Sequence, residues 1–172
     1  MNELNRLDIA SFKTSEKLPV IVVMDNVRSM NNIGSVFRTC DAFRIDAIFL
    51  CGITAKPPHK DIEKTALGAT ESVSWQYFES TKSAVEKLKN ENYNVFAIEQ
   101  VENSIFLNQF TIEKNEKLAL VFGNEVMGVE QEVINSCHGC IEIPQFGTKH
   151  SLNISVSAGI VLWQMVYLYN YQ

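Results

Sequence analysis

The sequence predicts an α/β protein with a mostly parallel β-sheet flanked by helices. Short apolar runs alternate with helical patterns along the chain, and several runs are followed by polar loops that contain glycine. The apolar runs are continuous, as in parallel strands that are buried on both faces. With 172 residues, 46% of them hydrophobic, the chain is expected to form a single domain with a substantial core over residues 1–172.

The N-terminal part is expected to form an arm, a strand and a helix. Residues 1–18 are polar with scattered apolar positions, which indicates a short amphipathic arm, and residues 19–25 (P-V-I-V-V-M-D) form the first apolar run. Asn31 or Asn32 is expected to cap the helix that follows. Its apolar stripe has i, i+3, i+4, i+7 spacing and comprises Ile33, Val36, Phe37 and Cys40.

The rest of the chain continues the alternation. Pro57 and Pro58 are expected to open a short helix that ends at the turn of Gly68. Two more helices are expected near residues 81–89 and 130–135. The further strands are expected at residues 47–52, 72–78, 94–99, 117–123 and 140–144.

The stretch from residue 147 onward passes from a polar loop into a long apolar run. Apolar residues then recur at steps of three and four, and the run is too long for a strand, so a helix is expected from Ile154 onward. Ser151 or Asn153 is the expected cap. The loop and the helix N-terminus would present N–H donors near the carboxyl end of a strand, where open α/β sheets bind ligands.

Composition limits the classes of function. The net charge of −5 argues against a general nucleic-acid coat protein, although one basic face would suffice for RNA binding. The first residues have no apolar core of a secretory signal, and the longest apolar run is shorter than a membrane span, so a cytoplasmic location is expected. Cations flank the motifs described below: Arg28, Arg38, Arg44, Lys56, Lys60, Lys149 and His150.

The four cysteines do not indicate a redox or metal site. Cys137 and Cys140 form a C-H-G-C pattern, but it precedes a strand instead of opening a helix, as a thioredoxin-type pair would. A structural zinc site would need two more ligands at a matching spacing. No metal is therefore expected.

Common nucleotide and hydrolase motifs are missing, and three polar loops remain as candidates. The chain contains no G-x-G-x-x-G, no G-x-x-x-x-G-K-[ST] and no G-x-S-x-G. The loops combine backbone donors with Asn, Glu, Ser or Arg, which suits group transfer by positioning and electrostatics. They are N-N-I-G-S-V-F-R, F-G-N-E-V-M-G and I-P-Q-F-G-T-K-H-S-L-N.

In this order, the three loops resemble the signature motifs of the SpoU (TrmH-type) RNA 2′-O-ribose methyltransferases of the SPOUT superfamily. The resemblance runs from about residue 20 to residue 165. It implies a C-terminal deep trefoil knot, S-adenosyl-L-methionine bound in a bent form by the knot loops, and a homodimer with the active site at its interface. It also implies methyl transfer to a ribose 2′-oxygen, with tRNA favoured over rRNA because only a short arm accompanies the catalytic part.

The resemblance assigns roles to particular residues. The catalytic candidates are Asn32 and Arg38 in the first motif, Glu125 in the second, and Ser151 and Asn153 in the third. The expected cofactor-binding residues are Ile98, Glu99, Gly123, Asn124, Ile143, Pro144, Gln145, Ser151 and Leu152. The expected RNA-binding residues are Arg28, Arg38, Arg44, Lys149 and His150.

These residues suggest a mechanism. A guanidinium stays protonated in proteins, so Arg38 is expected to hold an RNA phosphate and to stabilise the developing alkoxide. Asn32 would orient Arg38 or the ribose, and Glu125 would hold the second loop near the cofactor. Ser151 and Asn153 would fix the third loop and its contacts across the dimer.

Two alternatives from other classes stay open. A base methyltransferase of the same superfamily would favour a carboxylate general base in the third loop, which here offers Ser, Asn, Lys and His. A non-catalytic RNA-binding module on the same fold would be expected to have lost Arg38 or the S-L-N element, and this chain has both.

Overall fold

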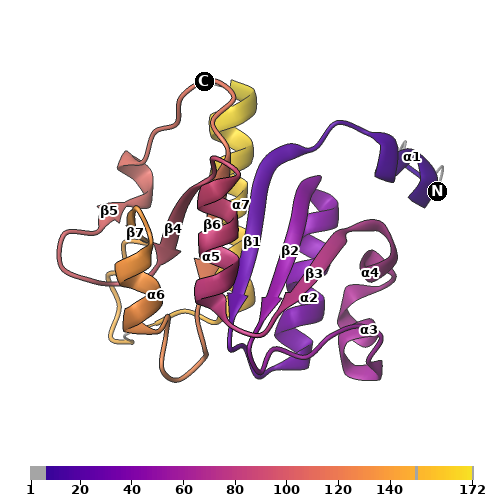
Figure 1. The fold of residues 1–172 in the computed structure, drawn as a ribbon, viewed down its shortest axis with the longest axis horizontal. Coiled ribbons are helices and arrows are strands. Elements are labelled where there is room, and N and C mark those ends of the chain that lie inside the picture. Colours follow the sequence, from indigo (N-terminus) through magenta and orange to yellow (C-terminus); the bar gives the residue numbers. More distant parts are fainter. Residues whose placement is uncertain (1–6, 150, 172) are drawn as a thin grey trace.

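The computed structural model describes residues 7–149 and 151–171, and its centre is a sheet of seven parallel strands (Figure 1). The strand order is β3-β2-β1-β6-β4-β7-β5. The predicted α/β fold with a parallel sheet is therefore confirmed. The strands are β1 (Leu18–Asp25), β2 (Ile45–Cys51), β3 (Ser74–Phe78), β4 (Asn94–Ile98), β5 (Ile105–Phe106), β6 (Leu118–Phe122) and β7 (Gly139–Glu142).

Helices cover both faces of the sheet (Figure 1). One face carries α2 (Met30–Ala42), α3 (Lys60–Ala66), α4 (Ala69–Ser72) and α7 (Ile154–Tyr171). The other face carries α5 (Thr81–Asn90) and α6 (Gln131–Ser136). The remaining elements are α1 (Ile9–Thr14) and the short 3-10 helix η1 (Leu107–Gln109).

Strand β1 shows why its residues form a continuous apolar run. Successive side chains of a strand point to opposite faces. Val20, Val22 and Met24 accordingly pack in the core under α2 and α7, whereas Ile21 and Val23 pack in the core under α5 and α6. Both faces are covered, so every one of these positions is apolar, as the sequence pattern predicted.

Several predicted boundaries are corrected by tertiary contacts. Helix α2 begins at Met30, and the Ser29 hydroxyl caps it by accepting a hydrogen bond from the Asn32 backbone amide at 3.3 Å, so neither asparagine is the cap. Pro57 and Pro58 lie before α3, which is capped by His59 and begins at Lys60. Helix α4 and the edge strand β5 were not predicted, because segments of four and two residues show no measurable periodicity.

The expected arm contains a helical turn that joins the core. Asp8 caps α1 by accepting a hydrogen bond from the Ser11 amide at 2.7 Å. Phe12 is buried in the core on the α2 side of the sheet. Residues 1–6 of the expected arm lie outside the described residues. No helix in the described ranges is long and apolar enough to cross a membrane.

Candidate active site

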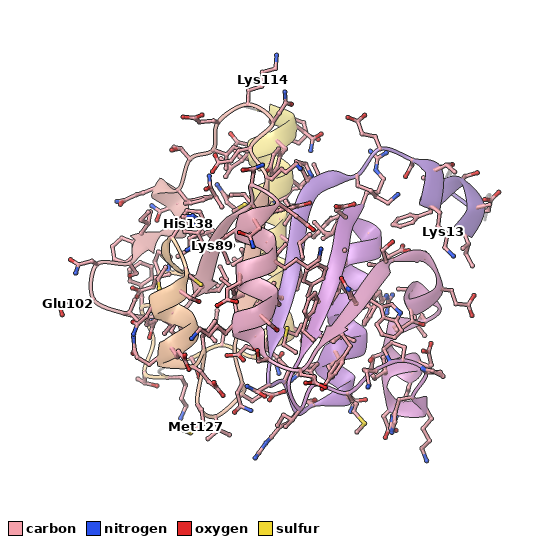
Figure 2. The ribbon with its side chains drawn as sticks, viewed as in Figure 1. Lys13, Lys89, Glu102, Lys114, Met127 and His138 are labelled. Carbon is pink, nitrogen blue, oxygen red and sulfur yellow. The ribbon has the colours of Figure 1, made fainter. Side chains whose placement is uncertain are left out.

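The three predicted loops meet at the carboxyl edge of the sheet. From β1 the chain moves outward through β2 and β3, then crosses to β4 on the other side of β6. Ligands bind open α/β sheets at the carboxyl ends of the strands beside such a reversal. Figure 2 shows Met127 projecting at this edge, in the loop after β6, while Lys114, which precedes β6, lies at the opposite edge.

The loop after β6 is a closed turn between Asn124 and Gly128. Their backbones exchange two hydrogen bonds of 2.9 Å. The Asn124 side-chain oxygen accepts hydrogen bonds from the backbone amides of Val126 and Met127, and its amide donates to the Asn26 carbonyl at 2.7 Å. Gly128 has φ +69°, a left-handed conformation that favours glycine. The turn therefore has a fixed shape and presents Glu125 toward the first motif.

Glu125 joins this turn to the start of α2. Its carboxylate accepts hydrogen bonds from the backbone amides of Arg28 and Ser29 at 3.0 and 2.9 Å, and from the Asn32 side-chain amide at 3.1 Å. A carboxylate that receives N–H donors at the beginning of a helix is also favoured by the helix dipole. Glu125 thus contacts the first motif directly.

Asn32 extends the network to the third motif. Its side-chain oxygen accepts a hydrogen bond from the Asn153 side-chain amide at 3.2 Å. Asn153 caps α7, because its oxygen accepts from the Ser155 amide at 2.9 Å. Of the two predicted caps for this helix, Asn153 is the one used. One chain of hydrogen bonds thus links Glu125, Asn32 and Asn153, one residue from each motif.

Asn32 does not orient Arg38 within this chain. Six residues along an α-helix correspond to about 9 Å of rise and about 240° of rotation, so the two side chains leave different sides of α2. Arg38 is exposed and makes no hydrogen bond or ion pair with any residue in the described ranges. Asn32 instead holds Glu125 and Asn153.

The buried carboxylate of Asp25 connects the end of β1 to neighbouring elements through hydrogen bonds. Asp25, at the end of β1, is fully buried and accepts hydrogen bonds from the Thr81 hydroxyl and from the Glu130 backbone amide at 3.1 Å. The neighbouring Asn26 donates to the carboxylates of both Asp25 and Glu130. The end of β1 is thereby tied to α5 and to the beginning of α6. The position of Asp25 at the end of an apolar run is the one sequence signal of this role.

A cavity of about 680 Å³ lies between the second and third loops and the end of β4. Eight of the nine expected cofactor-binding residues line the cavity: Ile98, Glu99, Gly123, Asn124, Ile143, Gln145, Ser151 and Leu152. The ninth, Pro144, does not. Pro144 lies between two lining residues, beyond the end of β7. The lining residues that sequence reasoning missed are Gln100, Val101, Phe122, Val126, Met127, Gly128, Val129, Gln131, Ile134, Ile154 and Ser157.

The expected RNA-binding residues are not all in one place. Arg28 and Lys149 are exposed on the first and third loops. Arg44 directly precedes β2, so it lies at the opposite edge of the sheet, beside a second cavity of about 650 Å³. His150 lies outside the described residues. Arg28 and Arg44 are close in the sequence, but α2, which is about 19 Å long, lies between them. Closeness in the sequence therefore did not show that Arg44 is at the other edge of the sheet.

The C-H-G-C segment has a structural role in the sheet. The His138 ring nitrogen Nδ1 accepts a hydrogen bond from the Val95 amide at 2.9 Å, and the His138 amide donates to the Val95 carbonyl, so His138 attaches this segment to β4. Burial raises the pKa of the Cys137 thiol to about 12, which keeps it protonated near neutral pH. Among the described residues, no three His, Cys, Asp or Glu side chains are grouped to hold a metal ion.

Replacement of Glu125 by glutamine is expected to lower stability in a pH-dependent way. Burial raises the pKa of the Glu125 carboxyl, but hydrogen bonds from the amides of Arg28, Ser29 and Asn32 outweigh it, so the pKa lies below its ordinary 4.5. A lowered folded-state pKa stabilises the protein above about pH 4.5, and this contribution disappears as pH falls through the folded-state pKa. Glu125→Gln should therefore lower the free energy of unfolding by about 1 kcal/mol at pH 7.

Urea denaturation of both proteins between pH 7 and pH 3 measures this difference. We expect the gap between wild type and Glu125→Gln to shrink below about pH 4.5. Glu102→Gln is the matched control, because Glu102 is exposed and the same charge is removed there. A gap that keeps its size down to pH 3 would contradict the assigned network.

The fold and the cavity define an α/β protein with a cavity of small-molecule size at the carboxyl edge of its sheet, where three loops from distant parts of the chain are hydrogen-bonded together. The sequence identifies the family within this class. Residues 19–163 match the SpoU rRNA Methylase family, and the chain belongs to this family, as its motifs predicted.

Known relatives agree with this family. The tRNA (guanosine(18)-2′-O)-methyltransferase of Aquifex aeolicus is 31% identical over 149 residues, which cover 84% of this chain and 67% of that protein. The protein of the same name from Borreliella burgdorferi is 27% identical over 144 residues, covering 84% of this chain and 64% of that protein. The chain spans 60% to 67% of the length of three curated relatives that it matches.

Solved structures show the same fold. The TrmH/SpoU tRNA modifying enzyme of A. aeolicus superposes with a TM-score of 0.79 at 25% identity, covering 91% of this chain and 78% of that chain. The AdoMet-bound rRNA methyltransferase of Sinorhizobium meliloti superposes with a TM-score of 0.80 at 24% identity, covering 87% of this chain and 56% of that chain. At that identity the second likeness concerns the fold alone.

Proposed function

We propose that this protein transfers a methyl group from S-adenosyl-L-methionine to a ribose 2′-oxygen of RNA, with tRNA favoured over rRNA. The observation that carries the proposal is the Glu125–Asn32–Asn153 network, which joins the three motif loops beside the 680 Å³ cavity. The name of the A. aeolicus relative, which specifies a guanosine 2′-O position in tRNA, supports the same reaction and substrate.

The cavity fits the proposed cofactor. Its volume lies within the range of small-molecule sites, about 300–1,000 Å³. Ile98, Ile143 and Leu152 would contact the apolar parts of the cofactor, and Asn124 and Ser151 would offer polar groups. When bound, S-adenosyl-L-methionine supplies a methyl group that passes from its sulfonium sulfur to the ribose oxygen, the sulfur keeping the electron pair and the hydroxyl proton leaving to water.

The residues of the first motif would act on the RNA. Arg38 would hold a phosphate and stabilise negative charge on the 2′-oxygen, because a guanidinium stays protonated and donates in a fixed planar geometry. Asn32, held by Glu125 and Asn153, would fix the start of α2 relative to the cofactor cavity. Arg28 and Lys149 would attract the RNA backbone at the same edge of the sheet.

A homodimer is part of the proposal, and the exposed face of α7 supports it. Val156, Ile160, Trp163 and Tyr167 follow an i, i+4, i+7, i+11 spacing, which places them on one side of the helix, and they are 49%, 39%, 55% and 45% exposed. A continuous exposed apolar stripe is typical of a protein interface. A second copy on this face would complete the active site with residues such as Arg38.

Replacement of Ile160 by glutamate is expected to weaken this dimer, because the charge would lie in the middle of the stripe. Sedimentation velocity should show a concentration-dependent dimer for the wild type and an equilibrium shifted toward monomer for Ile160→Glu by at least about tenfold in the dissociation constant. Leu67→Glu introduces the same charge at an exposed leucine on α3's end and should leave the dimer unchanged. A wild type that stays monomeric at high concentration would exclude the dimer.

The trefoil knot belongs to the same proposal. Strand β7 lies near one end of the sheet, but α7, which follows it in the chain, packs against α2 on the other half of the sheet. The chain therefore crosses back over the sheet after β7, which supports a threaded C-terminal part. The second and third loops would then belong to the knotted region around the cofactor.

Methyl transfer from labelled S-adenosyl-L-methionine to bulk tRNA and, separately, to rRNA tests the function. The RNA should come from a strain that lacks the protein, and the labelled product should be digested to nucleosides. We expect label on a 2′-O-methyl nucleoside from tRNA. Label on a base would favour the base methyltransferase, and absence of both transfer and cofactor binding would favour the non-catalytic module.

A further inference from the structure

The cofactor cavity has an acidic lining. Its described part includes the carboxylates of Glu99 and Glu125 and no Lys, Arg or His side chain. S-adenosyl-L-methionine carries a positive charge on its sulfonium sulfur, whereas the demethylated product, S-adenosyl-L-homocysteine, has a neutral thioether at the same position. Fixed negative charge in a partly enclosed site attracts the first more strongly than the second.

Glu99 is held at the cavity wall by two backbone amides. It directly follows β4, and its Oε1 and Oε2 accept hydrogen bonds from the amides of Gln100 and Val129 at 3.0 and 3.1 Å. A Cβ at Gly128 would lie 2.3 Å from Glu99 Oε2, so the glycine allows the carboxylate to approach the turn of the second motif. The charge therefore has a defined position beside that turn.

The two carboxylates differ in what else they do. Glu125 is bound to the first motif through three hydrogen bonds, so a change there disturbs the whole network. Glu99 contacts the end of β4 and the second loop, both of which form the cavity wall. Its charge can thus be altered while the link between the motifs is kept.

We propose that Glu99, together with Glu125, selects the sulfonium cofactor over its thioether product by charge and so favours product exchange after transfer. This inference rests on the proposed function, because it concerns the ligand of that reaction. The sequence resemblance placed Glu99 among the expected cofactor-binding residues without assigning a role to its side chain, and this proposal adds one.

Binding calorimetry with S-adenosyl-L-methionine and S-adenosyl-L-homocysteine, without RNA, tests the proposal. In Glu99→Gln the affinity for S-adenosyl-L-methionine should fall by about fivefold more than the affinity for S-adenosyl-L-homocysteine, a value that allows for solvent screening in an open cavity. Glu102→Gln is the control. It removes the same charge three residues further along the chain, from a side chain that does not line the cavity, and it should leave both affinities unchanged.

Each outcome decides between charge selection and a structural role. Glutamine can accept only one of the two backbone amides well, so a role limited to holding the turn would weaken both ligands equally. Equal weakening, or no change in either affinity, would overturn the proposal. A larger loss for the sulfonium ligand supports it.

The wild-type protein provides a second test that needs no variant. Preference for S-adenosyl-L-methionine should be present in 50 mM salt and should decrease toward 500 mM salt, because ions screen the carboxylates. Equal affinities for the two ligands at low salt would overturn the inference while leaving the proposed function intact. A wild type that binds neither ligand and labels no RNA would instead defeat the proposed function.

Discussion

Replacement of Arg38 by alanine is expected to lower methyl transfer to RNA by at least about 100-fold while leaving the affinity for S-adenosyl-L-methionine within about twofold of the wild type. The guanidinium is the exposed cation of α2 proposed to stabilise negative charge on the ribose oxygen, and it does not line the cofactor cavity of its own chain. Arg38→Lys keeps the charge but loses the planar fork of donors, so partial activity is expected.

Single-turnover transfer to saturating tRNA, with calorimetry for the cofactor, measures both quantities. Arg44→Ala is the matched control, because Arg44 is also an exposed arginine but lies at the opposite edge of the sheet. It should retain most of the transfer rate. Loss of cofactor binding in Arg38→Ala, or an unchanged transfer rate, would exclude the proposed role.

Replacement of Gly123 by alanine is expected to damage both the cavity and the stability of the fold. A Cβ at this position would lie 2.2 Å from the Gly128 carbonyl carbon and 2.2 Å from the Val129 nitrogen. Both are backbone atoms of the turn that follows β6, so the turn itself would have to move. We expect the free energy of unfolding to fall by about 1–3 kcal/mol and cofactor affinity to fall by at least about tenfold.

Gly147 offers a control for this change in the third loop. A Cβ at Gly147 meets no atom of the described residues within 4 Å, so Gly147→Ala should alter neither unfolding nor cofactor binding. Thermal denaturation and calorimetry on both variants give the comparison. Cofactor binding by Gly123→Ala at wild-type affinity would show that the second loop does not form the wall of the site.

The elements that the sequence predicted best are those whose burial is complete. Strand β1 was expected at residues 19–25 and extends over Leu18–Asp25, because helices cover both of its faces and apolar residues occupy nearly every position. The stripe of α2 was likewise predicted in full: Ile33, Val36, Phe37 and Cys40 are all buried. Periodicity reports burial directly, so these elements needed no further information.

Boundaries and caps were predicted less well because several residue types can serve the same local purpose. Serine and asparagine are both good N-caps, and the sequence favoured Asn31 or Asn32 where Ser29 caps α2. Asn32 was left free for a tertiary role, and its side chain bonds Glu125 and Asn153. A cap preference alone does not distinguish these uses.

By itself, the sequence determined the parallel α/β fold, the order of the three motif loops, their resemblance to the SpoU methyltransferases and eight of the residues that line the cavity. Only the tertiary structure decided how the loops meet. Asn32 is 93 residues from Glu125 and 121 residues from Asn153, and no local pattern encodes a hydrogen bond across such separations. The parallel sheet brings these loops together, because it places the carboxyl ends of its strands along one edge.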